Sequence, residues 1–234
     1  MGAPRTQRLA TLTLALAALL AGCTRTPDPS GQPTSRPACG PRQTLLRLME
    51  LRGQRQYTDL RLLVVPDRGS EVVATLLAVD DFLDANRRLC EWIRDNVGIG
   101  LAETIDQSDL GDALGLFARH VALLDESQDR DEAAVSYVVD THLPAGRARL
   151  RLINYTWRYD PEGGYSDELP AAFHELARGL DHVLTELRTG VLPTEGLHDD
   201  PARLVERVRG HLAPGVKLLS RARLAAESGG RERK

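Results

Sequence analysis

Aromatic residues and lysine are scarce in this sequence of 234 residues. Aromatic residues make up 4% of the chain, and of the 30 basic residues only Lys217 and Lys234 are lysines. The net charge is −3. Such a chain offers neither aromatic platforms on which bases stack nor a broad basic field, so we expect no nucleic-acid partner. The hydrophobic fraction of 42% and the charged fraction of 27% are ordinary for a globular protein, which excludes a collagen-like chain, disorder throughout and a multi-span membrane protein.

Long apolar runs are absent as well. An uncharged apolar run of 12 residues extends from Leu9 to Leu20, whereas a stable transmembrane helix needs about 20 residues. Arg5 and Arg8 precede this run, and the residues at its end, 20–23, read LAGC. A charged start, a short apolar segment and small residues at its end are typical of a secretory signal peptide.

The segment LAGC, ending at Cys23, resembles the lipobox of bacterial lipoproteins. The resemblance implies that residues 1–22 are removed, that Cys23 receives a diacylglyceryl thioether, and that the new N-terminus is acylated with a fatty acid such as palmitate. The protein would then lie outside the cytoplasm, with the lipid bilayer as a partner. Because Thr24 and not Asp follows the cysteine, the resemblance also implies an outer-membrane location facing the periplasm if the cell is Gram-negative. The alternatives are an ordinary signal peptide with an accidental cysteine, or an uncleaved anchor.

Residues 23–41 read as a tether between this cysteine and a folded domain. Five of the 13 prolines fall in residues 24–41, and such a segment cannot bury enough apolar area to fold. Pro-rich linkers extend by about 3.1 Å per residue, which gives a reach of roughly 50 Å. Removing residues 1–22 removes two arginines and no acidic residue, so the net charge changes from −3 to −5. We expect an acidic domain to stand away from anionic lipid.

The remaining sequence predicts an α+β domain over residues 42–190 and a C-terminal helical extension over residues 191–234. An apolar stripe at steps of three and four predicts a long helix over 69–97 that ends at Gly98. Similar patterns predict further helices over 45–53, 166–190, 201–212 and 214–228, with short helical turns over 101–118. Residues 57–65 are apolar and end at Pro66, which indicates a short helix or a strand, and we favour the helix. The last helix, after Pro214, is expected to be exposed.

The pattern changes to period two over residues 120–159. Strands are predicted over 120–124, 134–140, 147–152 and 156–159, with a polar turn over 127–132. Because these strands are close together and lack crossover helices, they should form an antiparallel meander of about four strands packed on a long helix. In the third strand, Ala148, Leu150 and Leu152 alternate with arginines, so we expect the apolar residues to be buried and the arginines to be exposed.

The segment 56–60 (QYTDL), leading to Pro66 after a first helix, and the segment 156–159 (TWRY) resemble parts of the NTF2-like (SnoaL-like) fold over about residues 42–160. This resemblance implies that helices and a curved sheet enclose a cone-shaped pocket. Some members of the family are enzymes, and many are binding or assembly modules. The sequence departs from the family in lacking an early strand between its first helices.

Few residues are candidates for a functional site. Asn86 lies on the apolar stripe of the long helix, where its amide must line a pocket or bond a nearby backbone group. Arg147, Arg149 and Arg151, with Arg158 joining them, form an anion-binding face or an outer sheet face paired with acidic neighbours. Cys39 and Cys90 remain after lipidation and could form a disulfide in an oxidising compartment; alternatively, Cys90 is a buried thiol and Cys39 is solvated.

Other clusters favour structural roles. His174 and His182 are eight residues apart, about 12 Å along a helix, so one metal ion cannot bridge them. Asp80, Asp81 and Asp84 precede two arginines and predict a solvated ion-pair surface. We therefore expect no metal or cofactor and assign no catalytic residue. The sequence favours a lipid-anchored binding or assembly module of the cell envelope, with an envelope protein or small ligand as partner; the alternative is an enzyme that uses an NTF2-like pocket on a small organic substrate.

Overall fold

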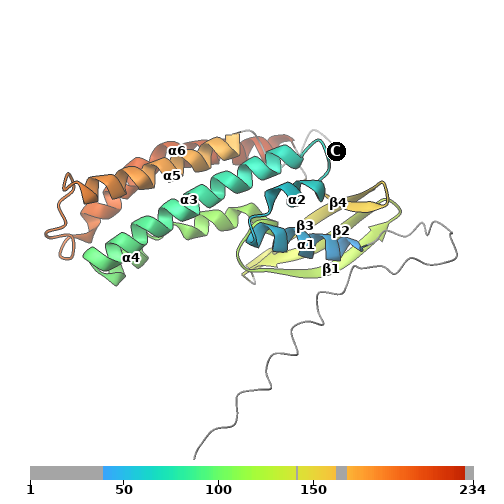
Figure 1. Ribbon diagram of the computed structural model, residues 1–234, viewed down its shortest axis with the longest axis horizontal. Helices are drawn as coiled ribbons and strands as arrows, with labels where there is room; N and C mark the ends of the chain where they lie inside the picture. The colour runs from blue at the N-terminus through green and yellow to red at the C-terminus, as the bar shows by residue number, and fades with distance from the viewer. Residues whose placement is uncertain (1–38, 141, 162–167, 230–234) are drawn as a thin grey trace, which may run out of the picture.

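The computed structural model describes residues 39–140, 142–161 and 168–229, and it confirms the predicted α+β class. A four-stranded sheet lies at one end of the molecule, and a bundle of helices extends from it (Figure 1). The helices are α1 (Pro41–Gly53), α2 (Tyr57–Leu62), α3 (Gly69–Asn96), α4 (Ile99–Ile105), the 3-10 segment η1 (Ser108–Phe117), α5 (Glu168–Arg188) and α6 (Pro201–Gly229).

The sheet is the predicted antiparallel meander, with strand order β1-β2-β3-β4. Its strands are β1 (Val121–Asp129), β2 (Glu132–Val139), β3 (His142–Ile153) and β4 (Thr156–Asp160). The turn predicted over 127–132 is wrong: β1 continues to Asp129, and β2 already begins at Glu132. The connection needs only two residues because Arg130 adopts a positive φ of 48°, as tight hairpin turns require.

The alternation in β3 places its residues as predicted. Ala148 and Leu150 are 2% and 1% exposed, whereas Arg147, Arg149 and Arg151 are exposed. Leu152, near the end of the strand, is half-buried and packs against the same core. Leu150 is opposite Ala133 on β2 and Tyr159 on β4, so the inner face is apolar across neighbouring strands.

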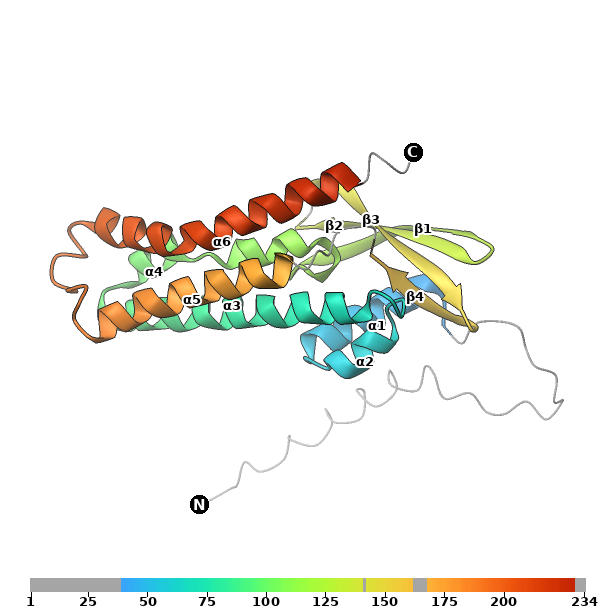
Figure 2. The ribbon, with the colours of Figure 1, turned by 90° about the horizontal axis from the view of Figure 1, so that it is seen from above.

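Two separate apolar cores are present, and α3 contributes to both. The first lies between the inner face of the sheet, α1 and the beginning of α3, with Leu45, Leu48, Leu76 and Trp157 all fully buried. The second lies among α3, α4, α5 and α6, where the ring centroids of Phe82 and Phe173 are 5.8 Å apart. Figure 2 shows α3 passing from the sheet into the bundle. Its 28 residues, at 1.5 Å per residue, make it long enough to serve both cores.

The C-terminal region differs from the prediction. Instead of two helices separated at Pro214, the structure has one helix, α6, which packs along α5. Over residues 215–222 the helix is mostly exposed, as predicted, although Gly215 and Ala222 are buried. A proline in a helix interior costs about 3 kcal/mol, which burial of several large side chains outweighs. The contact with α5 is close: a Cβ added at Gly179 would lie 2.6 Å from the carbonyl oxygen of His211.

The helix predicted over 57–65 is shorter in the structure. After α2 ends, Val64 forms an isolated parallel bridge to Tyr159 of β4. The backbone N–H of Val65 donates to the carbonyl of Tyr159 at 2.9 Å, and the N–H of Tyr159 donates to the carbonyl of Leu63 at 2.8 Å. These bonds satisfy the outer edge of β4, which would otherwise expose unpaired backbone groups.

Candidate functional site

The outer face of the sheet carries a concentration of arginine side chains. Residues that are directly opposite each other in the register point to the same face, so Arg147, Arg149 and Arg151 of β3 share this face with Ser136 and Glu132 of β2. On β4, Arg158 is opposite Arg151, and Asp160 is opposite Arg149. The structure therefore brings the predicted arginines together on the solvent side of the sheet.

A hollow of about 260 Å³ opens on this face. Ala134 is one of its lining residues and is directly opposite Arg149 on one side and Ser127 on the other. Because alanine has no side chain beyond Cβ, the longer neighbouring side chains stand around it as walls. We call this feature the sheet hollow, and its charged lining residues are Asp129, Glu132, Arg147, Arg149, Arg151 and Asp160.

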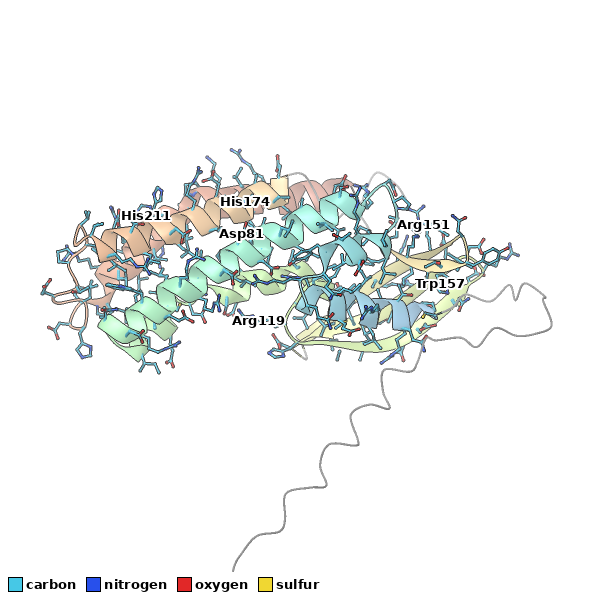
Figure 3. The ribbon with its side chains drawn as sticks, in the orientation of Figure 1. Asp81, Arg119, Arg151, Trp157, His174 and His211 are labelled. Atoms are coloured by element: carbon cyan, nitrogen blue, oxygen red, sulfur yellow. The ribbon has the colours of Figure 1, made fainter. Side chains whose placement is uncertain are left out.

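The arginines of the sheet hollow have different electrostatic surroundings. The Nε of Arg151 donates to Oδ2 of Asp160 at 2.6 Å, and this hydrogen bond raises the pKa of the Arg151 guanidinium. Arg147 is exposed, is opposite the neutral Ser136, and has no side-chain hydrogen bond or ion pair to the described residues. The sequence left two interpretations of this face open, an anion-binding surface and an outer sheet face paired with acidic residues. Arg151 fits the second, because it is paired with Asp160, whereas Arg147 is available to an external anion. Figure 3 shows Arg151 near the edge of the sheet.

Asn86 is 4% exposed, and both the nitrogen and the oxygen of its amide are hydrogen-bonded. Its Nδ2 donates to Oδ1 of Asp106 at 2.6 Å, and its Oδ1 accepts the backbone N–H of Gln107 at 3.1 Å. The Ser108 N–H donates to the same Asp106 oxygen at 2.9 Å. Burial would raise the pKa of Asp106, but the hydrogen bonds from Asn86 and Ser108 outweigh it and lower that pKa. Asn86 therefore bonds nearby backbone, fastening the segment after α4 to α3, and it also borders an open hollow of about 460 Å³.

Replacing Asn86 by alanine should lower the free energy of unfolding by about 1–3 kcal/mol, because it leaves the Gln107 N–H without its acceptor and removes one of the two hydrogen bonds to the Asp106 carboxylate. Urea denaturation of the variant and of the wild type measures the difference. The matched control is Asn96→Ala: Asn96 is exposed and bonds only the carbonyl of Trp92, so its replacement should change stability by less than about 0.5 kcal/mol. Equal effects of the two variants would contradict the role assigned to Asn86.

The disulfide between Cys39 and Cys90 is not formed. Cys90 is buried in the helical core, and its Sγ lies 4.0 Å from Oδ1 of Asn86. Burial raises the pKa of the Cys90 thiol to about 11, so it is protonated at neutral pH. Cys39 precedes α1, which is tied to the sheet by hydrogen bonds from the Arg42 guanidinium to the carbonyls of Leu123 and Leu124. The two cysteines thus belong to opposite parts of the molecule.

The aspartates of α3 form a more structured network than the sequence predicts. Asp80 is buried, and its Oδ1 lies 2.5 Å from Nη2 of Arg52 at the end of α1. Another Arg52 nitrogen donates to the hydroxyl of Tyr57 at 2.8 Å. The prediction of a solvated surface is therefore wrong for Asp80. The burial of Asp80 could have been inferred from its position four residues after Leu76, which places it on the side of α3 that faces α1 and α2.

The other members of this cluster follow the prediction in part. Asp84 pairs with Arg87, as expected, but also with Arg55 from the turn after α1, whose hydrogen bonds lower the pKa of Asp84. Arg88 instead pairs with Asp181 of α5 at 2.8 Å. Arg52 and Arg55 thus connect the end of α1 and the following turn to α3, and Arg88 separately connects α3 to α5.

The histidines of the helical bundle make pairwise contacts. Asp81 and His174 face each other from α3 and α5, with Nδ1 and Oδ2 3.7 Å apart (Figure 3). His211 lies 3.2 Å from Glu186, which also pairs with Arg207, and the hydrogen bond from Arg207 lowers the pKa of Glu186. Among the residues that the structure describes, no group of three His, Cys, Asp or Glu side chains is placed to hold a metal ion.

Comparison of the chain with protein-family models, with curated proteins and with solved structures found no match. The NTF2-like resemblance therefore stays a prediction. Cys23 and most of the tether lie outside the described residues, so the lipobox also stays a prediction. Within the described part of the chain, no helix is both long and apolar enough to cross a bilayer.

Proposed function

We propose that this protein is a bacterial lipoprotein, anchored outside the cytoplasm by an acylated Cys23, whose folded domain is a binding or assembly module of the cell envelope. The observation that carries the proposal is the LAGC segment at residues 20–23, placed after two arginines and an apolar run of 12 residues. One acyl chain binds a membrane only marginally, whereas two or more hold a protein there stably. Triacylation of Cys23 would make the attachment permanent.

The structure supports binding through the surface more than binding in an internal pocket. The space beneath the sheet, where the NTF2-like resemblance places a pocket, is filled by packed side chains including Leu45, Leu48 and Trp157. The hollows near Arg147, Asn86 and Glu186 open on the surface and have charged residues in their walls. A domain on a tether of about 50 Å presents such surfaces to partners in the envelope.

The anchoring is tested by metabolic labelling with an alkyne-bearing palmitate analogue. The wild-type protein should carry the label and remain with membranes after a carbonate wash, while Cys23→Ala should lose both because it lacks the thiol that forms the thioether. Cys39→Ala is the matched control and should behave as the wild type. Retention of label and membrane attachment by Cys23→Ala would show that the proposal is wrong.

A further inference from the structure

Tyr155 differs from the other aromatic residues of the described chain in its exposure. It is 66% exposed, whereas every other aromatic residue that the structure describes is buried or half-buried. Tyr155 packs in neither apolar core and makes no hydrogen bond or ring contact with a described residue. Single exposed apolar residues are common on protein surfaces, so exposure alone assigns no role to this ring. Its backbone supplies a second, independent observation.

The backbone of Tyr155 has a conformation that tyrosine rarely adopts. Asn154 and Tyr155 are the two central residues of the β3–β4 hairpin turn, because Ile153 is directly opposite Thr156. Their φ angles of 50° and 62° are those of a type I′ turn, which favours asparagine followed by glycine. Asparagine tolerates this left-handed region, whereas a larger side chain is strained there and glycine is not. The turn would therefore fold better with glycine at position 155, and the tyrosine ring has no structural role that offsets the strain.

The surroundings of Tyr155 are polar. The β3–β4 turn lies at the end of the sheet away from the helical bundle, as does the β1–β2 turn (Figure 2). The N–H of Leu152 donates to the carbonyl of Asp131 at 2.8 Å, which connects the two hairpins. Residues 129–132 read DRDE and are all exposed, and Arg151 and Arg158 are opposite each other on β3 and β4. An aromatic side chain among charged neighbours of both signs has the composition of an interface hot spot with its polar rim.

We propose that Tyr155 is the anchor through which the domain binds a partner protein of the cell envelope. The ring inserts into an apolar pocket on the partner, and the charged residues 129–132 contribute to the polar rim around it. A tyrosine ring offers a large, rigid contact area that loses little conformational entropy on binding. Because a hairpin turn projects from its sheet, the matching surface of the partner is concave. This proposal rests on the proposed function as a binding module and names its contact residue.

A protein pocket fits this surface better than a lipid bilayer does. Tyrosine also occurs at membrane interfaces, but anionic lipid attracts basic neighbours and repels acidic ones. Three of the four residues 129–132 are acidic. A protein surface, in contrast, can place complementary charges opposite both signs.

Two substitutions test whether Tyr155 is strained. Tyr155→Gly removes both the ring and the strain, whereas Tyr155→Ala removes the ring and keeps a Cβ atom in the left-handed region. In urea denaturation of the full lipidated protein in neutral detergent, the unfolding equilibrium constant of the glycine variant should be about fivefold lower than that of the alanine variant. Equal stability of the two variants would show that position 155 is not strained and would overturn the proposal.

Photo-crosslinking in the membranes of the native cell tests the binding. The full lipidated protein carries the photoreactive residue p-benzoylphenylalanine in place of Thr156, the exposed neighbour of Tyr155. Illumination should link it to one envelope protein, and mass spectrometry should map the link to the rim of an apolar pocket. Adding Tyr155→Gly or Tyr155→Ala should lower the yield at least about tenfold, as expected for a hot-spot residue, while Tyr155→Phe should keep most of it. Because the glycine variant is the more stable one, its loss of yield cannot come from unfolding.

A distant position provides the control for the crosslinking. The same photoreactive residue in place of Val191, which is 69% exposed and follows α5, should not link to that protein. Three outcomes would overturn the proposal: a yield that does not depend on Tyr155, links to phospholipid alone, or no link from position 156. None of them changes the labelling test of Cys23, so failure of this proposal is distinguishable from failure of the proposed anchoring.

Discussion

Replacement of Asp80 by alanine is expected to lower the free energy of unfolding by about 3–5 kcal/mol, the usual cost of removing one partner of a buried ion pair. The side chains of Asp80 and Arg52 are 10% and 14% exposed, so water cannot replace the lost carboxylate around the guanidinium. The Nε of Arg52 is already buried without a hydrogen-bond partner, which makes the remaining charge more costly. The loss occurs where α1 and α2 meet α3, and it should loosen the joint between the two cores.

Chemical denaturation of three variants tests this explanation. Asp81→Ala is the matched control because Asp81 is the next residue on α3, is 65% exposed and makes one long contact with His174; it should change stability by less than about 0.5 kcal/mol. The double variant Arg52→Met, Asp80→Leu should recover most of the stability lost in Asp80→Ala, because it leaves no unpaired charge. A small effect of Asp80→Ala, or a double variant less stable than the single one, would contradict the buried-pair account.

Replacement of Leu150 by arginine should unfold the sheet half of the protein. Leu150 is 1% exposed and packs in the core that α1 shares with the sheet. The substitution removes about 2–3 kcal/mol of apolar burial and adds a buried, unpaired guanidinium that costs several kcal/mol more. The sum is comparable with the 5–15 kcal/mol by which a typical domain is stable. Near-ultraviolet circular dichroism should lose the part of its signal that comes from packed Trp157 and keep the part from Trp92, which packs against the helical core.

The neighbouring position provides the control for this prediction. Arg149→Ser changes an exposed residue on the outer face of the same strand and should shift the free energy of unfolding by less than about 0.5 kcal/mol. A one-residue slip of the register would exchange the two faces, so the contrast between positions 149 and 150 measures whether the register is firm. A loss of more than about 2 kcal/mol in Arg149→Ser would mean that the outer face is structurally buried.

Local sequence patterns correctly predicted those helices and strands in which buried residues recur at the helical or the strand period. The alternation of residues 147–152 determined both faces of β3, and the apolar stripe of α3 located a helix that the structure gives within a residue at each end. What could not be predicted depends on distant packing. Pro214 is a helix breaker by local criteria, but its helix is held by α5 through Gly179 and Gly215. The partner of Asp80 is 28 residues earlier in the chain, so no spacing within α3 identifies it.

The sequence identified the arginines of the candidate site but did not predict the hollow that they line. The sequence placed Arg147, Arg149 and Arg151 on one face, because that follows from alternation alone. The sheet hollow depends on which residues of β1 and β2 are opposite them, and this register is fixed by the short turn at Arg130. The role of Asn86 was likewise left open between a pocket and a backbone contact, since its partners, Asp106 and Gln107, follow a separate helix.

Mass spectrometry of the N-terminal tryptic peptide, from protein extracted from membranes, tests the proposed anchoring most directly. Trypsin cleaves after Arg25, so a processed lipoprotein should yield residues 23–25 (CTR) carrying a diacylglyceryl group on the Cys23 sulfur and a fatty acyl group on its amine. An uncleaved chain should instead yield the unmodified peptide of residues 9–25, because Arg8 is the preceding cleavage site. The lipidated peptide is the predicted result; the peptide of residues 9–25, or an unmodified N-terminus at another position, would contradict the account.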